Sequence, residues 1–228
     1  MTDSTETTAA PLTHAGRRAP EPLDPRTAEV FHASVSDPLA RFTGLLELAR
    51  ANPHTREPTA MSLSTVDADG QPSSRIVLLK QLDARGFVFF TNLHSRKGRA
   101  IAANSRVALL FHWQALEVQV RIEGPAVLVQ DAEADDYFAH RPRQSQLGAW
   151  ASEQSEELAS REELIARFKK LDEKFANQPV ARPPHWSGFY VAPRTIEFWR
   201  NQESRLHERE RYSRADERTP WAHALLNP

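Results

Sequence analysis

The sequence of 228 residues contains no cysteine. This absence excludes disulfides, thiolate metal sites and a cysteine nucleophile. It also fits a reducing compartment, and we therefore expect a cytoplasmic protein. Only eight residues are glycine and no two of them lie close together, so neither a Walker loop nor the dinucleotide motif GxGxxG is present. A bound phosphate would have to be held by side-chain cations and helix N-termini.

Other signatures of function are also missing. The sequence has no HExxH motif and no GxSxG motif. No apolar run approaches the roughly 18 residues that a membrane span needs, and residues 1–19 lack the apolar block of a secretory signal. With 29 basic and 30 acidic side chains, the net charge of −1 does not suit a general nucleic-acid coat. We expect no membrane or nucleic-acid partner, and no metal site, because His207 has no second ligand at a suitable spacing.

The composition predicts one domain preceded by a tail. Hydrophobic residues make up 40% of the chain, which is enough for a sizeable core. Residues 1–36 are rich in Thr, Ala, Pro and Arg without an apolar period, which indicates a disordered segment. Order is expected to begin near Ser36, because Ser36 or Asp37 can cap a helix that starts with Pro38. The predicted domain spans residues 37–228.

Short strand-like segments separated by turn sequences dominate this domain. Helices are predicted over residues 38–49, 95–104, 131–140, and from the capping box at Ser160 to Phe175. Strands are predicted over residues 59–66, 73–80, 87–91, 106–113, 117–123, 126–129, 186–191, 195–199, 205–213 and 221–226. This pattern favours a mostly β member of the α+β class, an antiparallel Greek-key-like barrel with helices packed outside.

Two clusters combine cations with strand or helix ends. Arg75 and Lys80 bracket four apolar residues, and on a regular strand they would face opposite sides, as they would in an ordinary core strand. Arg96 and Lys97 follow Ser95, the expected cap of a helix. Cations in the first turn oppose the helix dipole. They indicate either a bound anion such as a phosphate or two solvated charges.

Two further clusters lie later in the chain. Tyr137 and Arg141 are four residues apart on a helix end, and Ser145 follows in the expected loop; together they would suit a phosphate monoester, or Tyr137 is simply half-buried packing. In the last cluster, residues 205, 207, 209 and 211 would share one face of a strand near Trp199. That row indicates an anionic or electron-rich ligand, or an edge strand protected by charge.

In this order, the segments resemble the pyridoxamine (pyridoxine) 5′-phosphate oxidase family. The similarity runs from about Asp37 to Pro228. The matching stretches are RIVLLK (75–80), FTNLHSRK (90–97), LLFHW (109–113), LEVQVRIEG (116–124), YFAHRPRQSQLGAW (137–150), QS (154–155), WSGF (186–189), EFW (197–199) and RLHER (205–209).

The resemblance implies an FMN-binding split barrel that works as a homodimer, with FMN at the subunit interface. It further implies oxidation of pyridoxamine 5′-phosphate or pyridoxine 5′-phosphate to pyridoxal 5′-phosphate, with O2 as the acceptor and H2O2 as the second product. In such enzymes the flavin supplies the redox chemistry, and the protein supplies binding, orientation and electrostatics.

Residues are assigned by position in the matching motifs. The resemblance implies FMN contacts from Arg75, Ile76, Val77, Leu78, Leu79, Lys80, Phe90, Thr91, Arg96, Lys97, Gln119, Gln154, Ser155, Trp199 and Arg209. It implies substrate contacts from Lys80, Tyr137, Arg141, Ser145, Arg205, Leu206 and His207. Arg205 and His207 are the expected catalytic pair over the pyridine ring: Arg205 would steady developing charge, and His207 could act as a general base.

The sequence departs from the family pattern at several positions. Phe90 stands where Tyr is common, Val118 where Arg is usual, Asn201-Gln202 where a glycine-rich turn is usual, and Glu208 where Asp is usual. Two related alternatives stay open. One is an oxidase of phenazine biosynthesis, and the other is a flavin-binding split barrel without this oxidase activity.

Overall fold

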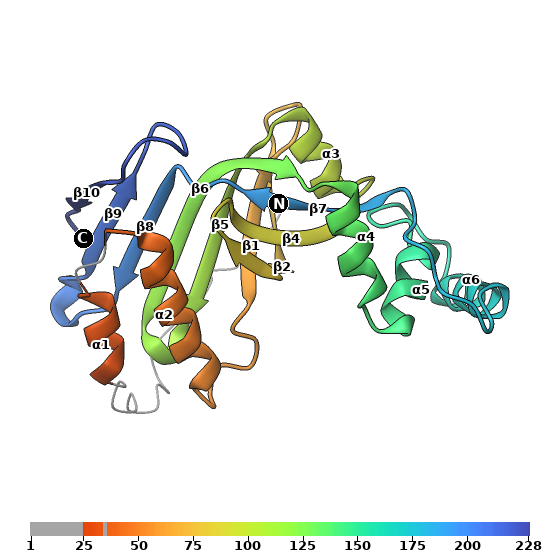
Figure 1. The fold of residues 1–228 in the computed structure, drawn as a ribbon, viewed down its shortest axis with the longest axis horizontal. Coiled ribbons are helices and arrows are strands. Elements are labelled where there is room, and N and C mark those ends of the chain that lie inside the picture. The colour runs from red at the N-terminus through yellow and green to blue at the C-terminus, as the bar shows by residue number, and fades with distance from the viewer. Residues whose placement is uncertain (1–24, 34–35) are drawn as a thin grey trace, which may run out of the picture.

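The computed structural model describes residues 25–33 and 36–228. A curled antiparallel sheet forms its centre, with helices on the outside (Figure 1). The strands are β1 (Ala60–Val66), β2 (Pro72–Leu78), β3 (Gln81–Asp83), β4 (Gly86–Asn92), β5 (Arg106–Trp113), β6 (Val118–Leu128), β7 (Trp186–Val191), β8 (Thr195–Arg200), β9 (Glu208–Ser213) and β10 (Ala222–Leu225). The helices are α1 (Pro25–Phe31), α2 (Pro38–Ala51), α3 (Arg96–Ala103), α4 (Asp131–Ala139), α5 (Arg143–Ala151) and α6 (Arg161–Lys174), with short 3-10 turns at Gln114–Leu116 and Glu203–Arg205.

Strand β6 curls the sheet because it takes part in both halves. Its first part pairs with β8 in the order β10-β9-β8-β6-β5-β1-β2, and its last residues pair with β7, which continues to β4 and β3. The change of partner occurs at Gly124-Pro125. A Cβ on Gly124 would lie 2.0 Å from the carbonyl oxygen of Ala192, so this close approach requires glycine. The two strands predicted over 117–123 and 126–129 are therefore one bent strand.

Side-chain N-caps mark the starts of three helices. The Asp37 side chain caps α2 by accepting a hydrogen bond from Leu39 N–H, and Ser95 caps α3 by accepting one from Gly98 N–H. Ser160 accepts from Glu163 N–H and begins α6, as predicted. Helix α4 differs slightly, because Gln130 rather than Asp131 occupies its N-cap.

The tail prediction for residues 1–36 is wrong in part. Helix α1 forms at Pro25–Phe31, and Phe31 is fully buried against the core. Its short length and the surrounding prolines concealed it from the sequence pattern. Residues 1–24 and 34–35 of that prediction lie outside the described residues.

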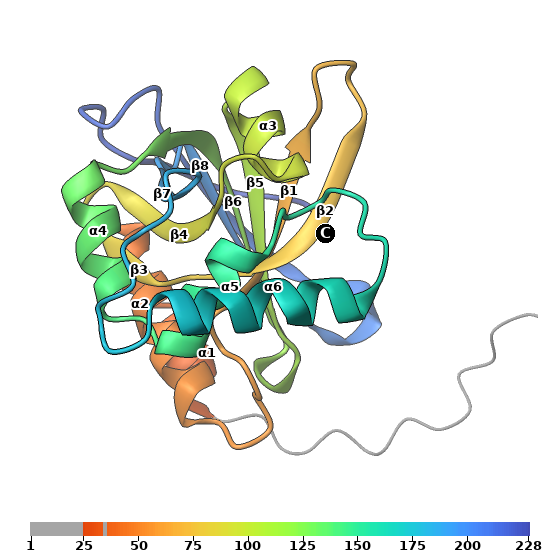
Figure 2. The ribbon, with the colours of Figure 1, turned by 90° about the vertical axis from the view of Figure 1, so that its right-hand side faces the viewer.

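The main core lies between the sheet and α2. Phe42 on α2 is fully buried, with its ring 4.9 Å from the rings of both Phe87 and Phe111 and 5.6 Å from that of Trp113. A second, smaller core joins α4, α5 and α6 at the other end of the molecule (Figure 1), the end that faces the viewer in Figure 2; Phe138, Leu147 and Trp186 are buried there. The described residues contain no helix long and apolar enough to cross a membrane.

Candidate functional site

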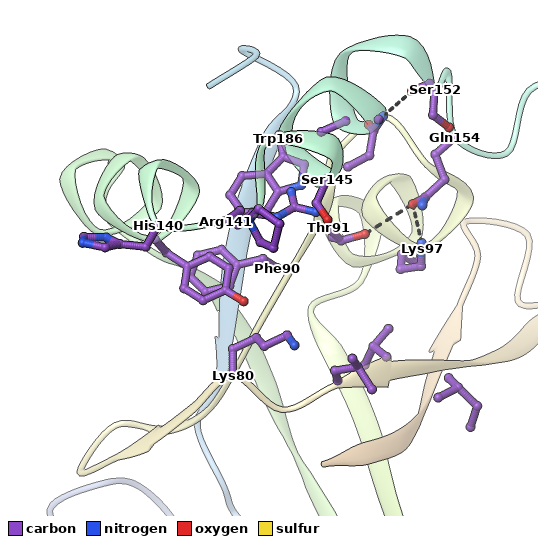
Figure 3. A pocket seen from close by; sticks show the side chains of 18 residues that line it. Lys80, Phe90, Thr91, Lys97, His140, Arg141, Ser145, Ser152, Gln154 and Trp186 are labelled. Atoms are coloured by element: carbon purple, nitrogen blue, oxygen red, sulfur yellow. Dashed lines mark hydrogen bonds between the residues drawn. The ribbon is translucent and has the colours of Figure 1, made fainter. Parts of the chain in front are cut away.

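A cavity of about 700 Å³ lies where the α4–α5 lobe meets the ends of β2 and β4 (Figure 3). It brings together much of the predicted site. Its walls come from Ile76, Val77, Leu78, Lys80, Phe90, Thr91, Asn92, Lys97, Tyr137, His140, Arg141, Pro142, Ser145, Gly148, Ala149, Ser152, Gln154 and Trp186.

One end of the cavity carries groups suited to an anion. Tyr137 lies on α4, and Arg141 lies just beyond its end. The chain does not then run into a loop, as the sequence analysis expected. Pro142 is the N-cap of α5, which places Ser145 in the first turn of that helix. Lys80 reaches the same cavity from the strand side (Figure 3), so two cations, two hydroxyls and a helix N-terminus lie around one space.

The half-buried guanidinium of Arg141 lacks a full set of hydrogen-bond partners within the described part of the chain. Its Nη1 atom is buried and has no hydrogen-bond partner among the residues that the structure describes. Burial lowers the pKa of Arg141 and raises that of Tyr137, which the positive charge of Arg141 partly opposes. A buried donor without a partner is costly unless a ligand satisfies it, so the site favours an anion here.

The other end of the cavity holds a second group of cations. Lys97 Nζ lies 2.7 Å from Gln154 Oε1, and Thr91 Oγ1 donates to the same oxygen at 3.4 Å. Burial, followed by the positive charge of Arg75, lowers the pKa of Lys97 to about 8. Arg96, the next cation, forms an exposed ion pair of 2.7 Å with Asp67.

Arg75 belongs to the same end of the site but not to the cavity wall. Its guanidinium donates to Thr65 Oγ1 at 2.8 Å and to Ser73 Oγ at 2.6 Å. Burial and the charge of Arg96 lower the pKa of Arg75. The Leu79 side chain is buried in the core, and Ser155 lies in an exposed loop with a left-handed φ of 77°.

The remaining predicted residues lie on a different part of the chain. Gln119 pairs with Trp199, which pairs with Arg209, so these three side chains stand in a row across β6, β8 and β9. They face away from the core, because Val118 and Val120 beside Gln119 are fully buried. Two strands lie between β2 and β6 and three between β2 and β8, so Trp199 is four strand spacings from β2, about 19 Å measured along the curled sheet.

The predicted catalytic pair lies next to this row but not on a strand. Strand β9 begins only at Glu208, and the preceding turn places Ser204 at a φ of 56° and Arg205 at a φ of 63°. The expected shared strand face for residues 205–211 is therefore wrong for Arg205 and His207. His207 packs on Trp199 with ring centroids 4.6 Å apart. Leu206, between the pair, is 69% exposed.

Several cavity residues were not singled out from the sequence. Trp186 is the most buried of them, at 5% exposed, and it lies within one of the motifs that carry the family resemblance. Asn92 and Ser152 are joined by a hydrogen bond of 3.4 Å between the Asn92 amide and the Ser152 carbonyl. His140 belongs to the wall but points away from the other side chains in Figure 3. No group of three His, Cys, Asp or Glu in residues 25–33 and 36–228 could hold a metal ion.

Comparisons with known proteins identify two matching family profiles. One, described as pyridoxamine 5′-phosphate oxidase, matches residues 49–175, more than half of the chain. The other, described as pyridoxine 5′-phosphate oxidase C-terminal dimerisation region, matches residues 186–228. The first profile covers the cavity residues except Trp186, which lies with Trp199 and Arg209 in the second.

Curated relatives agree with these profiles. A pyridoxine/pyridoxamine 5′-phosphate oxidase of Myxococcus xanthus (strain DK1622) is 55% identical over 192 residues, which is 84% of this chain and 92% of the relative. The protein of the same name from Caulobacter vibrioides (strain NA1000 / CB15N) is 54% identical over 183 residues, 80% of this chain and 82% of the relative.

Solved structures confirm the predicted split-barrel fold. PhzG from Burkholderia lata 383, solved in complex with tetrahydrophenazine-1-carboxylic acid, has a TM-score of 0.80 and 32% identity, covering 90% of this chain and 98% of that one. A pyridoxamine 5′-phosphate oxidase-related, FMN-binding protein from Nostoc punctiforme has a TM-score of 0.68 at 14% identity, covering 86% and 99%. The second likeness concerns the fold alone.

Proposed function

This chain belongs to the pyridoxamine 5′-phosphate oxidase family, and from that premise we propose that it is an FMN-dependent oxidase that makes pyridoxal 5′-phosphate. The substrates would be pyridoxine 5′-phosphate and pyridoxamine 5′-phosphate. The alcohol gives up two electrons and two protons, which reduce O2 to H2O2. The amine also consumes one water and releases ammonia. The observation that carries the proposal is a single cavity with a set of cationic and hydroxyl groups at each end.

One end of the cavity fits the cofactor. Arg75, Arg96 and Lys97 form a cationic group beside Thr91 and Gln154, and a phosphate dianion would offset the burial that lowers the pKa of Lys97. Ile76, Val77 and Leu78 would line the apolar side of the flavin. When bound, FMN accepts a hydride equivalent from the substrate and passes two electrons to O2.

The other end fits the phosphate of the substrate. Lys80, Tyr137, Arg141 and Ser145 would hold it, and the unpartnered Nη1 of Arg141 supplies a ready donor. A phosphate far from the reacting carbon is a handle whose binding energy orients the rest of the molecule. Ring-on-ring orientation of substrate and flavin would in turn lower the barrier to hydride transfer.

The site requires a second copy of the chain. The walls of the cavity include none of five predicted residues, Gln119, Trp199, Arg205, His207 and Arg209, and along the sheet Trp199 is four strands from β2. In a homodimer, each protomer would present these residues to the cavity of the other, with FMN at the interface. The match of residues 186–228 to a dimerisation region supports this arrangement.

The geometry also bears on the roles of the catalytic pair. Gln202 N–H donates to His207 Nδ1 at 3.2 Å, so the neutral ring carries its proton on Nε2. His207 would then donate a hydrogen bond to the substrate ring rather than accept a proton at Nε2. Arg205, exposed on a turn, would provide the positive charge that steadies charge developing on the substrate.

The first test combines a spectrum and an assay. The purified protein should be yellow, elute at about twice its chain mass of 25.8 kDa, and convert pyridoxine 5′-phosphate in air to the aldehyde and peroxide in equal amounts. A colourless protein that takes up no added FMN would refute the proposal. A yellow protein that leaves both phosphorylated substrates unchanged would instead favour the phenazine-type or non-oxidase alternatives. A phenazine precursor carries no phosphate, so it would not account for the phosphate-binding end of the cavity.

FMN affinity should depend on pH through Lys97. Because the pKa of Lys97 is lowered to about 8 in the free site, its positive charge is present below that pH and is lost above it. The dissociation constant for FMN, measured by quenching of flavin fluorescence, should be constant from pH 7 to 7.5 and rise up to about tenfold by pH 9.5. Lys97→Arg should remove the pH dependence, and riboflavin, which lacks the phosphate, should not show it.

A further inference from the structure

Trp186 forms the base of an aromatic stack at the substrate-phosphate end of the cavity. Its ring is nearly parallel to those of Phe90 and Tyr137, with interplanar angles of 3° and 4°. Phe90 and Tyr137 stack directly, with centroids 4.0 Å apart. Strand β7 supplies Trp186, β4 supplies Phe90 and α4 supplies Tyr137, so the stack ties the α4–α5 lobe to the sheet. The Tyr137 hydroxyl is thereby held at a fixed place.

The same indole ring holds Arg141. The guanidinium carbon of Arg141 lies 4.6 Å from the centre of the Trp186 ring and 5.7 Å from that of Phe138. These distances are within the range of cation–π attraction. Figure 3 shows Trp186 and Arg141 side by side, with Ser145 next to them.

Arg141 differs from two other arginines, Arg143 and Arg182, in how it is held. Arg143 pairs with Asp172, and Arg182 pairs with both Asp131 and Asp135. Arg141 forms no ion pair with a carboxylate in the part of the chain that the structure describes, and its Nη1 has no partner there. A carboxylate would orient the guanidinium but also neutralise it and compete with an anionic ligand. An aromatic face orients the guanidinium and leaves its charge and its donors available.

We propose that Trp186 is a positioning residue for the substrate phosphate: its indole face fixes the guanidinium of Arg141, and through Phe90 the hydroxyl of Tyr137, toward a phosphate monoester in the cavity. This inference rests on the proposed function only for the identity of the ligand. It assigns to Trp186 the selectivity for phosphorylated over unphosphorylated pyridine ligands. Pre-orientation matters because a free arginine side chain would lose rotamer freedom on binding.

The test uses two probes that cannot be oxidised, 4-deoxypyridoxine 5′-phosphate and 4-deoxypyridoxine. Their dissociation constants are measured by calorimetry on the FMN-loaded enzyme and on its Trp186→Leu and Trp186→Phe variants. Trp186→Leu should weaken the phosphorylated probe by about 5- to 30-fold, the range expected for loss of a desolvated cation–π contact. The unphosphorylated probe should change less than twofold, and Trp186→Phe should restore most of the loss, because it keeps an aromatic face.

Two controls separate positioning from general stability. Trp150→Leu removes another indole of the same lobe, one that donates to the Ala181 carbonyl at 2.7 Å and does not line the cavity. It should leave the ratio of the two dissociation constants unchanged. In an Arg141→Ala background, Trp186→Leu should cause a smaller further loss of the ratio than in the native enzyme, because the part of its effect that passes through Arg141 is already lost and only the part through Tyr137 remains.

The outcomes are distinct. Equal weakening of both probes, no weakening, or no recovery in Trp186→Phe would each overturn the inference. If Trp186→Leu does not fold, the ratio of the two dissociation constants in Trp186→Phe decides. A small loss of phosphorylated-probe binding that shrinks in an Arg141→Ala background supports the inference, and no loss overturns it. If the native enzyme prefers the phosphorylated probe but oxidises no substrate, the proposed function fails while this inference stands. If it binds both probes equally, this inference fails whatever the oxidase activity.

Discussion

Replacing Arg141 by alanine is expected to lower kcat/KM for pyridoxine 5′-phosphate by about 10²- to 10³-fold. The guanidinium would form two charge-assisted hydrogen bonds to the substrate phosphate, each contributing about 1.5–3 kcal/mol. Arg141 already lies in the cavity with one donor unpartnered, so little rearrangement is needed to bind the anion. Steady-state kinetics should show a large rise in KM. A fall in kcat should accompany it, because the phosphate also orients the ring.

Arg143→Ala is the matched control for this variant. Arg143 lies two residues further on, but its guanidinium reaches Asp172 at 3.1 Å and the Phe175 carbonyl at 3.0 Å, on the α6 side of the lobe. Its removal should change kcat/KM less than threefold. If Arg141→Ala behaves like Arg143→Ala, then Arg141 does not bind the substrate phosphate, and the assignment of this end of the cavity is wrong.

The largest expected effect on stability comes from Phe42→Ala. Phe42 is fully buried and its ring contacts those of Phe87 on β4 and of Phe111 and Trp113 on β5, so the substitution removes ring contacts between α2 and two strands of the sheet. The free energy of unfolding should fall by about 3–5 kcal/mol, the usual cost of a large cavity in a core. Urea denaturation at a fixed protein concentration measures it, because association would also contribute to stability.

Leu158→Ala provides the comparison. Leu158 is 41% exposed, so its truncation should change the free energy of unfolding by less than about 0.5 kcal/mol. A Phe42→Ala variant as stable as Leu158→Ala would mean that α2 contributes little to the core. The dissociation constant for FMN in the folded fraction should be the same in both variants.

The sequence was most informative where structure depends on neighbours in the chain. The caps at Asp37, Ser95 and Ser160 are each a side chain bonding to a backbone N–H two or three residues away. Ser95 and Ser160 were predicted, and Asp37 was one of two predicted candidates with Ser36. The strands were found because their alternation follows from one buried face. The failures at α5 and before β9 concern backbone conformations that residue type does not decide. Helix α4 ends before Pro142 as predicted, but Pro142 then begins α5 instead of a loop, and Ser204 and Arg205 adopt positive φ values.

The candidate site could be predicted as a set of residues but not as an arrangement. Position in the motifs named Arg141, Lys97 and Trp199 as candidates, yet no pattern in the sequence shows that Trp199 lies four strand spacings along the sheet from β2, which borders the cavity. Strand order is decided by contacts between distant segments. Trp186 entered the sequence analysis only as part of the WSGF motif, because no neighbouring residue in the sequence indicates that its ring would pack on a guanidinium.

The placement of sulfur in this molecule bears on its durability as an oxidase. In the proposed reaction every turnover releases one peroxide beside the cavity, and thiols and thioethers are the side chains that peroxide attacks most readily. The sequence contains no cysteine and only two methionines. Met61 lies within the core at 1% exposed, and Met1 lies outside the described residues. The described part of the chain therefore keeps its one sulfur-containing side chain almost wholly buried, away from its own product, which should slow this form of self-inactivation.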